Sequence, residues 1–183
     1  MKTLIIYTSQ TGFTKRYAEW IAERLTADVI TVDEFKKTSD DALKDYDTVL
    51  FGSWASMGKA VRADLFFARA REWTGKKLAL FWVGAADTNE PHMQEDIKKV
   101  VPEDLKDSIP VFYCPGGLNY EKMSLPSKMM MKAFAAMLKK DASKKEQAEL
   151  YSHSFDHSDK KYIEPIIEYV TMGTNLNAIS NAD

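Results

Sequence analysis

Short apolar runs rich in strand-forming residues recur along the chain, separated by longer amphipathic stretches. The five runs cover residues 3–7, 28–32, 48–53, 78–85 and 109–114. Runs of this length that are apolar on both alternating faces are typical of parallel strands covered by helices on both sides. The hydrophobic pattern therefore predicts a five-stranded parallel sheet.

The stretches between these runs carry apolar residues at helical spacing. Tyr17, Ile21 and Leu25 form one stripe of a helix predicted over residues 14–25. Similar patterns predict further helices over residues 40–46, 62–73, 91–101 and 160–172. This alternation of strands and helices indicates a doubly wound α/β fold. Right-handed crossovers then favour the strand order 2-1-3-4-5.

One segment is longer than this plan requires. Residues 115–159 follow the fifth strand, where a connection of two to six residues would be ordinary. Within the segment, residues 127–140 have a helical pattern rich in Met and Lys, and residues 141–159 are polar and are predicted to be irregular. We therefore expect a single domain over residues 1–173 with an inserted segment at 115–159, and a frayed tail over residues 174–183.

Composition and charge exclude several classes of protein. The formal net charge is -2, so the excess of positive charge expected of a nucleic-acid-binding protein is absent. Cys114 is the only cysteine, so no intrachain disulfide can form. We find no apolar run of the length that spans a membrane and no secretory signal pattern, and expect a cytoplasmic protein.

The clearest chemical signal directly follows the first predicted strand. This loop opens the first predicted helix and consists of Thr8, Ser9, Gln10, Thr11, Gly12, Phe13 and Thr14. The N–H groups at a helix N-terminus attract anions. The loop contains four hydroxyls and a glycine, and it lacks the lysine of a Walker A site. It therefore predicts a phosphate site made of neutral donors; the alternative is that a hydroxyl merely caps the helix.

The segment from Ser9 to Thr14 resembles the FMN-phosphate loop of flavodoxins. This resemblance implies a flavodoxin-like fold and bound FMN, with FAD as the lesser candidate. It also implies that two further loops enclose the flavin ring. The matching residues here are Ser53, Trp54, Ala55, Ser56, Met57 and Gly58 in the first loop, and Gly84, Ala85, Ala86, Asp87 and Thr88 in the second.

The chain departs from electron-carrier flavodoxins in three respects. Phe13 stands where the family commonly has Asn, and no aromatic residue lies between Gly84 and Pro91 to stack on the ring. The near-neutral charge also differs from the acidic carriers. Trp54 is either a stacking partner of the ring or an anchor of its loop.

The segment after the fifth strand suggests a subfamily. The stretch from Gly116 to Tyr120, followed by the Met- and Lys-rich helix, resembles menaquinone-dependent protoporphyrinogen oxidase. This resemblance implies an FMN-dependent oxidoreductase with a quinone or a reductase as redox partner. The alternatives are an electron carrier without its own substrate and a flavodoxin-like module that has lost FMN.

The remaining sequence features give weaker evidence for a function. The helix at 127–140 either contacts an anionic membrane peripherally or packs as an ordinary core helix with a solvated lysine face. His153 and His157 are four residues apart, but the surrounding serines indicate a loop, and we expect no metal site. No catalytic residue can be assigned from the sequence.

Overall fold

The computed structural model describes residues 2–88 and 92–172, so the predicted tail at 174–183 and the first residue of the helix predicted over 91–101 lie outside the described residues. The strands of the main sheet are β1 (Thr3–Tyr7), β2 (Asp28–Thr31), β3 (Thr48–Ser56), β4 (Lys59–Ala60), β5 (Lys77–Gly84) and β6 (Val111–Pro115). The α-helices are α1 (Phe13–Leu25), α2 (Val32–Phe35), α3 (Asp40–Leu43), α4 (Ala63–Ala70), α5 (Met93–Val100), α6 (Leu125–Leu138), α7 (Lys145–Leu150) and α8 (Glu164–Thr171). A separate two-stranded ribbon consists of β7 (Gly117–Leu118) and β8 (Phe155–Asp156), and short 3-10 turns cover Glu103–Leu105, Ala142–Lys144 and Lys160–Ile163.

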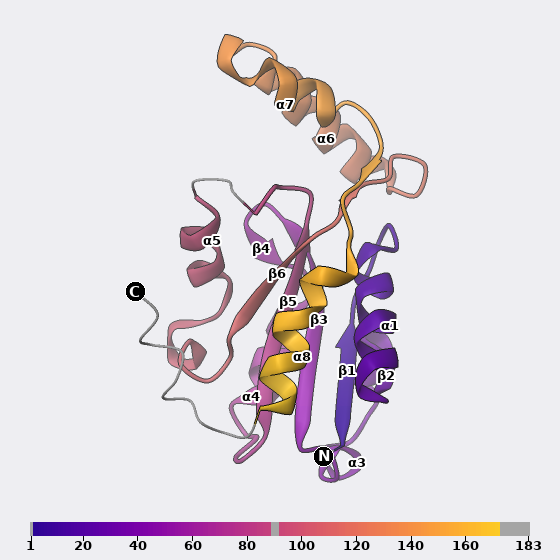
Figure 1. The fold of residues 1–183 in the computed structure, drawn as a ribbon, viewed down its shortest axis with the longest axis vertical. Coiled ribbons are helices and arrows are strands. Elements are labelled where there is room, and N and C mark those ends of the chain that lie inside the picture. The colour runs from indigo at the N-terminus through magenta and orange to yellow at the C-terminus, as the bar shows by residue number, and fades with distance from the viewer. Residues whose placement is uncertain (1, 89–91, 173–183) are drawn as a thin grey trace.

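The main sheet runs in the order β2-β1-β3-β5-β6, and all of these neighbouring strands are parallel. β4 is a short antiparallel arm on β3, so the order is the predicted 2-1-3-4-5, and the flavodoxin-like doubly wound fold is confirmed. Figure 1 shows the strands at the centre of the molecule with helices on both sides.

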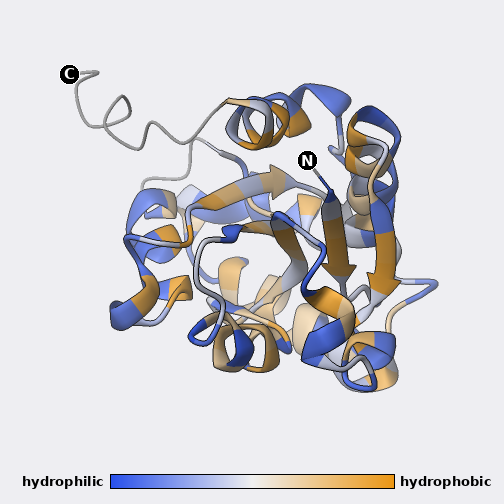
Figure 2. Cartoon of the chain, turned by 90° about the horizontal axis from the view of Figure 1, so that it is seen from below, coloured by the Kyte–Doolittle hydropathy of each residue, from blue (hydrophilic) through white to orange (hydrophobic). Residues whose placement is uncertain are grey.

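Two hydrophobic clusters lie on opposite faces of the sheet because neighbouring strand residues point in opposite directions. On one face Ile5, Leu50 and Phe81 pack with α1 and α8. On the other face Phe51 and Leu80 pack with the helices α2 to α5. Figure 2 shows the strands coloured hydrophobic between helices of mixed character. The central strands β1, β3 and β5 are thus buried on both faces, as their runs without alternation predict, whereas the edge strand β2 has no buried residue.

The region after the third strand differs from the prediction. Residues 53–56 were expected in a loop but continue β3, which turns at Met57 and Gly58 into β4. Both turn residues have positive φ, as tight two-residue hairpin turns require. Trp54, Ala55 and Ser56 are half-buried, whereas the first six residues of β3 are buried, so this end of the strand is only partly covered.

Several helices also differ from the prediction: α4 ends at Ala70 rather than at residue 73, and α6 covers Leu125–Leu138 rather than residues 127–140. α2 was not predicted, although its capping box is readable in the sequence: the Thr31 hydroxyl accepts from the Glu34 N–H, and the Glu34 carboxylate accepts from the Thr31 N–H. α3 ends at Leu43 rather than at residue 46. The last predicted helix begins as a 3-10 turn, and α8 follows it from Glu164.

The inserted segment is more ordered than predicted. Residues 141–159 were expected to be irregular, but they contain α7 and β8. α6 and α7 lie side by side and project beyond the end of the sheet, joined to it through the β7–β8 ribbon (Figure 1). The pair has a small core of its own, formed by Leu118, Ala135, Leu138, Ala148 and Tyr151. α7 buries only Ala148, so its sequence pattern was too weak to detect.

Within the described residues, no helix has the length and apolar character that crossing a bilayer would need.

A close contact between β3 and β5 gives a test of the fold. Gly52 lies opposite Phe81 in the sheet, and a Cβ on Gly52 would lie 2.1 Å from Cζ of the Phe81 ring. We expect Gly52→Ala to lower the free energy of unfolding by about 1–3 kcal/mol, because the core would be overpacked. Urea denaturation measures this change.

The Phe81→Leu variant provides the control. It removes the ring that the new methyl group would strike, so the double variant should lose less stability than the sum of the two single losses. Strict additivity of the two losses would contradict this account of the contact.

Candidate functional site

The loop between β1 and α1 places unpaired donors at the carboxyl edge of the sheet. Gly12 precedes α1 with φ +104°, a conformation that other residues rarely adopt. The N–H groups of the first helical turn, at Phe13, Thr14 and Lys15, have no partner inside the helix. They carry the positive end of the helix dipole. This end of α1 is therefore suited to an anion.

The hydroxyls of the loop are not used to cap the helix. α1 has no side-chain cap, and the Ser9 hydroxyl accepts from the Gly12 N–H at 3.1 Å within the loop. Thr14 is 1% exposed, and its hydroxyl oxygen has no hydrogen-bond partner. A buried polar group without a partner is costly and calls for an explanation. The capping alternative for this loop is therefore not what the geometry supports.

A polar pocket of about 350 Å³, here called the phosphate-side pocket, opens beside this loop. Its lining comprises Tyr7, Thr8, Ser9, Gln10, Thr11, Gly12, Lys15, Thr31, Val32, Asp33, Arg62 and Lys122. Three cations and one carboxylate are among these residues, so the pocket has an excess of positive charge. The guanidinium of Arg62 forms two hydrogen bonds with Asp33 and holds the pKa of that carboxyl below its usual range.

A second, mainly apolar pocket of about 110 Å³, here called the ring-side pocket, lies on the other side of the loop. The core domain contributes Gln10, Thr11, Phe13, Thr14, Trp54, Ala55, Val83, Gly84 and Ala85. The inserted segment contributes Gly117, Leu118, Met123, Ser127, Met130 and Met131. Residues from all three predicted loops thus meet in one place. Gly117 and Leu118 line this pocket together with Gly84 and Ala85 of the second loop.

Some predicted site residues lie apart from both pockets. Ser53 is buried, and its hydroxyl donates to the Val61 carbonyl at 2.8 Å. Met57, at the tip of the β3–β4 hairpin, is 85% exposed. The residues that line neither pocket are Ser53, Ser56, Met57, Gly58, Ala86, Asp87 and Thr88.

Hydrogen bonds hold the two sides of the ring-side pocket in place. The Tyr113 hydroxyl donates to the Ala86 carbonyl at 2.8 Å, and the Gly116 N–H donates to the Gly84 carbonyl at 2.6 Å. Burial raises the pKa of Tyr113 above its usual value, so the phenol stays protonated as a donor. The second predicted loop is therefore anchored to β6 and to the start of the insertion.

Several lining residues were missed by sequence reasoning. Arg62 follows β4, and nothing in its local sequence indicates a pocket. Asp33 follows β2. Lys122 and Met123 reach the loop only because the insertion folds back over α1. A weak signal was available for Asp33, since it follows a strand at the carboxyl edge where ligands bind in open α/β sheets.

The other titratable candidates take no part in these pockets. Cys114 is fully buried, and burial raises the pKa of its thiol, so it is a neutral thiol in the core. His153 contacts Glu149 at 3.0 Å on the exposed insertion. Among residues 2–88 and 92–172, no group of three His, Cys, Asp or Glu side chains could hold a metal.

Comparisons with known proteins identify the family of this chain. The sequence model of a family described as flavodoxin domain matches residues 4–145. An uncharacterized protein from Methanocaldococcus jannaschii is 35% identical over 82 residues, which are 44% of this chain and 53% of that protein. The match thus spans about half the length of this relative.

Three solved structures illustrate proteins to which the chain is similar in fold. A flavodoxin, WrbA-like protein from Agrobacterium tumefaciens is 20% identical with a TM-score of 0.47, over 69% of this chain and 87% of its own. The Trp repressor binding protein from Bacillus subtilis is 15% identical with a TM-score of 0.46, over 86% and 100% of the two chains. A flavoprotein in complex with FMN from Lactobacillus acidophilus is 20% identical with a TM-score of 0.43, over 62% and 91%.

The family match covers well over half of the chain and includes the phosphate loop, the β3–β4 hairpin and the end of β5. This chain therefore belongs to the flavodoxin domain family.

Proposed function

We propose that this protein binds FMN at the carboxyl edge of its sheet and uses it for electron transfer. The observation that carries the proposal is the buried, unpartnered hydroxyl of Thr14 beside the free N–H groups of the first turn of α1. A terminal phosphate would give both sets of donors a partner, since a phosphate monoester offers three acceptor oxygens. The residues present thus fit this cofactor.

The proposed binding residues divide between the two pockets. The phosphate would lie against the loop of Thr8, Ser9, Gln10, Thr11, Gly12, Phe13 and Thr14, at the point where the two pockets meet, since of these two pockets Phe13 and Thr14 line only the ring-side pocket. The ring would lie toward Trp54, Ala55, Gly84 and Ala85, with the rest of the 53–58 and 84–88 segments supporting these positions. When bound, FMN supplies the redox chemistry, and the protein supplies position and electrostatics.

The chain's own residues would exclude water from the ring. Phe13, at the position of the family's Asn, packs in the core cluster on the α1 face of the sheet and forms part of the apolar wall. The ring-side pocket is smaller than the about 300 Å³ or more that is typical of ligand sites. Met130 and Met131 have flexible side chains that can reorient to widen it.

Two threonines provide a matched test of FMN binding. Thr14 and Thr48 are both buried with unpartnered hydroxyls, but only Thr14 lines a pocket. Thr14→Val and Thr48→Val should each raise the unfolding free energy of the ligand-free protein by about 1 kcal/mol, because each removes an unsatisfied group. Only Thr14→Val should weaken FMN binding, by about tenfold. Flavin fluorescence during titration measures the affinity.

The same titration separates the alternatives. A wild-type protein that does not bind FMN after reconstitution would contradict the proposal and favour a module that has lost its cofactor. Equal affinities of the two variants would contradict the role of Thr14. FAD should bind more weakly than FMN, because the loop is suited to a terminal phosphate.

A second candidate function is oxidation of a large apolar substrate, such as a porphyrinogen, with a quinone as acceptor. The observation that favours it is the row of methionines from the insertion in the ring-side pocket: Met123, Met130 and Met131. A carrier that is steered to its partners by charge would need a strongly acidic surface, and a net charge of -2 supplies little. The redox partner that donates or accepts the electrons would be a quinone or a reductase.

Turnover decides between enzyme and carrier. The FMN-loaded protein should oxidise protoporphyrinogen with menaquinone, as followed by porphyrin fluorescence. Met130→Glu places a charge on the rim of the apolar pocket, and a bound apolar substrate would bury that charge without a partner, so the rate should fall by about tenfold or more. Lys139→Glu, at the far end of α6, is the control. No turnover with any quinone would leave the carrier function.

The insertion also fits peripheral contact with an anionic membrane through residues 127–140. Met129 and Met137 are 72% and 57% exposed, and lysines lie on the same helix. An exposed apolar patch flanked by lysines matches the interface of an anionic bilayer.

Vesicle binding tests this contact. Replacing both residues (Met129→Gln with Met137→Gln) should reduce cosedimentation with anionic vesicles by about tenfold or more, because two apolar side chains are lost from the interface. FMN affinity should not change, because neither residue lines a pocket. Met172→Gln, on an equally exposed methionine at the end of α8, is the control. Wild-type protein that stays in solution with such vesicles would contradict the contact.

A further inference from the structure

The turn just before α6 lies over the phosphate loop. Lys122 lines the phosphate-side pocket, and Met123 lines the ring-side pocket. The Ser124 hydroxyl accepts from the side-chain amide of Gln10, a residue of the phosphate loop, at 3.4 Å. Three consecutive residues of the insertion therefore meet the loop on different sides.

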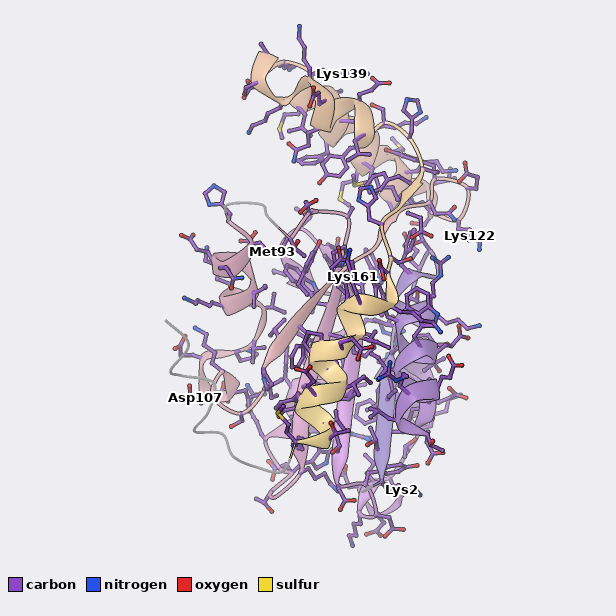
Figure 3. The ribbon with its side chains drawn as sticks, viewed as in Figure 1. Lys2, Met93, Asp107, Lys122, Lys139 and Lys161 are labelled. Atoms are coloured by element: carbon purple, nitrogen blue, oxygen red, sulfur yellow. The ribbon has the colours of Figure 1, made fainter. Side chains whose placement is uncertain are left out.

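Lys122 also lines a third pocket, of about 470 Å³, on the far side of the α1 N-terminus. Thr11, Gly12, Lys15 and Lys122 are common to this pocket and the phosphate-side pocket. The side chain of Lys122 is thus placed where the two pockets adjoin, beside the free N–H groups of α1. Figure 3 shows Lys122 in the loop at the base of the α6–α7 pair, with Lys139 at the far end of the pair.

The three cations of the phosphate-side pocket differ in their partners. Arg62 is paired with Asp33, and the Lys15 ammonium lies 3.6 Å from the Glu19 carboxylate. Among the residues that the structure describes, the Lys122 ammonium has no carboxylate within ion-pair distance. Lys122 is therefore the cation with its charge free for a ligand.

Hydrogen bonds fix the backbone of the turn, whereas the Lys122 side chain has no ion-pair partner among the described residues. The Lys122 N–H donates to the side-chain carbonyl of Asn119 at 3.1 Å, and the Met123 N–H donates to the Asn119 backbone carbonyl at 3.1 Å. Ser124 then caps α6 by accepting from the Ser127 N–H. The turn thus keeps Lys122 at a constant place relative to the helix that follows.

We propose that this turn, residues 122–124, is a fourth cofactor-binding element and that the Lys122 ammonium binds the phosphate of FMN. The inference rests on the proposed FMN site. A phosphate monoester carries a charge of about -1.5 to -2 at neutral pH. The neutral donors of the loop and the partial charge of about +0.5 at the α1 N-terminus compensate only part of this charge. Lys122 supplies a full positive charge at the same point and so links phosphate binding to the position of the insertion.

Lys122→Gln tests the proposal, with Lys139→Gln as a control of equal charge on the same insertion. Both side chains are exposed, so both variants should fold. Lys122→Gln should weaken FMN binding by about five- to tenfold, as expected for the loss of a hydrogen bond to a charged group. Lys139→Gln should bind FMN as the wild type does, and Lys122→Arg should retain most of the affinity.

Riboflavin, which has the ring without the phosphate, is the second arm. Its affinity should be the same for wild type and Lys122→Gln. The wild-type affinity for FMN should fall with added salt more steeply than that of Lys122→Gln, because one ion pair is screened. Inorganic phosphate should raise the melting temperature of the wild type more than that of Lys122→Gln.

These measurements distinguish failure of the Lys122 assignment from failure of the FMN site. Equal FMN affinity of Lys122→Gln and Lys139→Gln would overturn the assignment of Lys122 and leave the FMN site standing. An equal loss of riboflavin affinity would show that the side chain acts on the ring or the fold, and would also overturn it. A wild type that binds neither FMN nor riboflavin would overturn the proposed function together with this inference.

Discussion

A single buried tyrosine ties the phosphate helix to both ends of the insertion. The Tyr17 hydroxyl donates to the Pro115 carbonyl at 2.6 Å and accepts from the Asp159 N–H at 3.2 Å. The phenol lies in the core, and burial raises its pKa, so it remains a donor at any physiological pH. Tyr17 is one turn into α1, so the free N–H groups at the start of this helix are held relative to the place where the insertion leaves and rejoins the sheet.

The sheet could be predicted from the sequence because each strand is recognisable from the apolar residues of one short run. The runs of the central strands β1, β3 and β5 are apolar on both faces, and a parallel sheet with helices on both sides buries such strands. The right-handed crossover rule then leaves few strand orders. The β3–β4 hairpin was missed because β4 has only two residues and the end of β3 is half-buried, so neither gives a clear strand pattern. α7 was missed because six residues that bury one alanine carry no detectable periodicity.

Part of the candidate site could likewise be predicted from the sequence, and part could not. The phosphate loop was readable because its donors come from consecutive residues at one strand–helix junction. Trp54, Ala55, Gly84 and Ala85 were found through the order of the strands, and they do line the ring-side pocket. Met57 was not distinguishable from them, since its exposure depends on how the hairpin turns. Lys122 could not be found from sequence because its place over the loop depends on residues 155–159 returning to α1.

The ribbon that joins the insertion to the sheet depends on one small residue. A Cβ on Gly117 would lie 2.0 Å from the Phe155 carbonyl oxygen, so β7 and β8 can pair this closely only when position 117 has no side chain. Beyond this narrow neck, the α6–α7 pair has its own core and shares none of its buried residues with the two clusters on the sheet. Substitutions on the surface of the pair that faces away from the ring-side pocket can therefore accumulate during evolution without disturbing the two clusters on the sheet. The same fold can thus acquire new partners through this outer surface of the insertion.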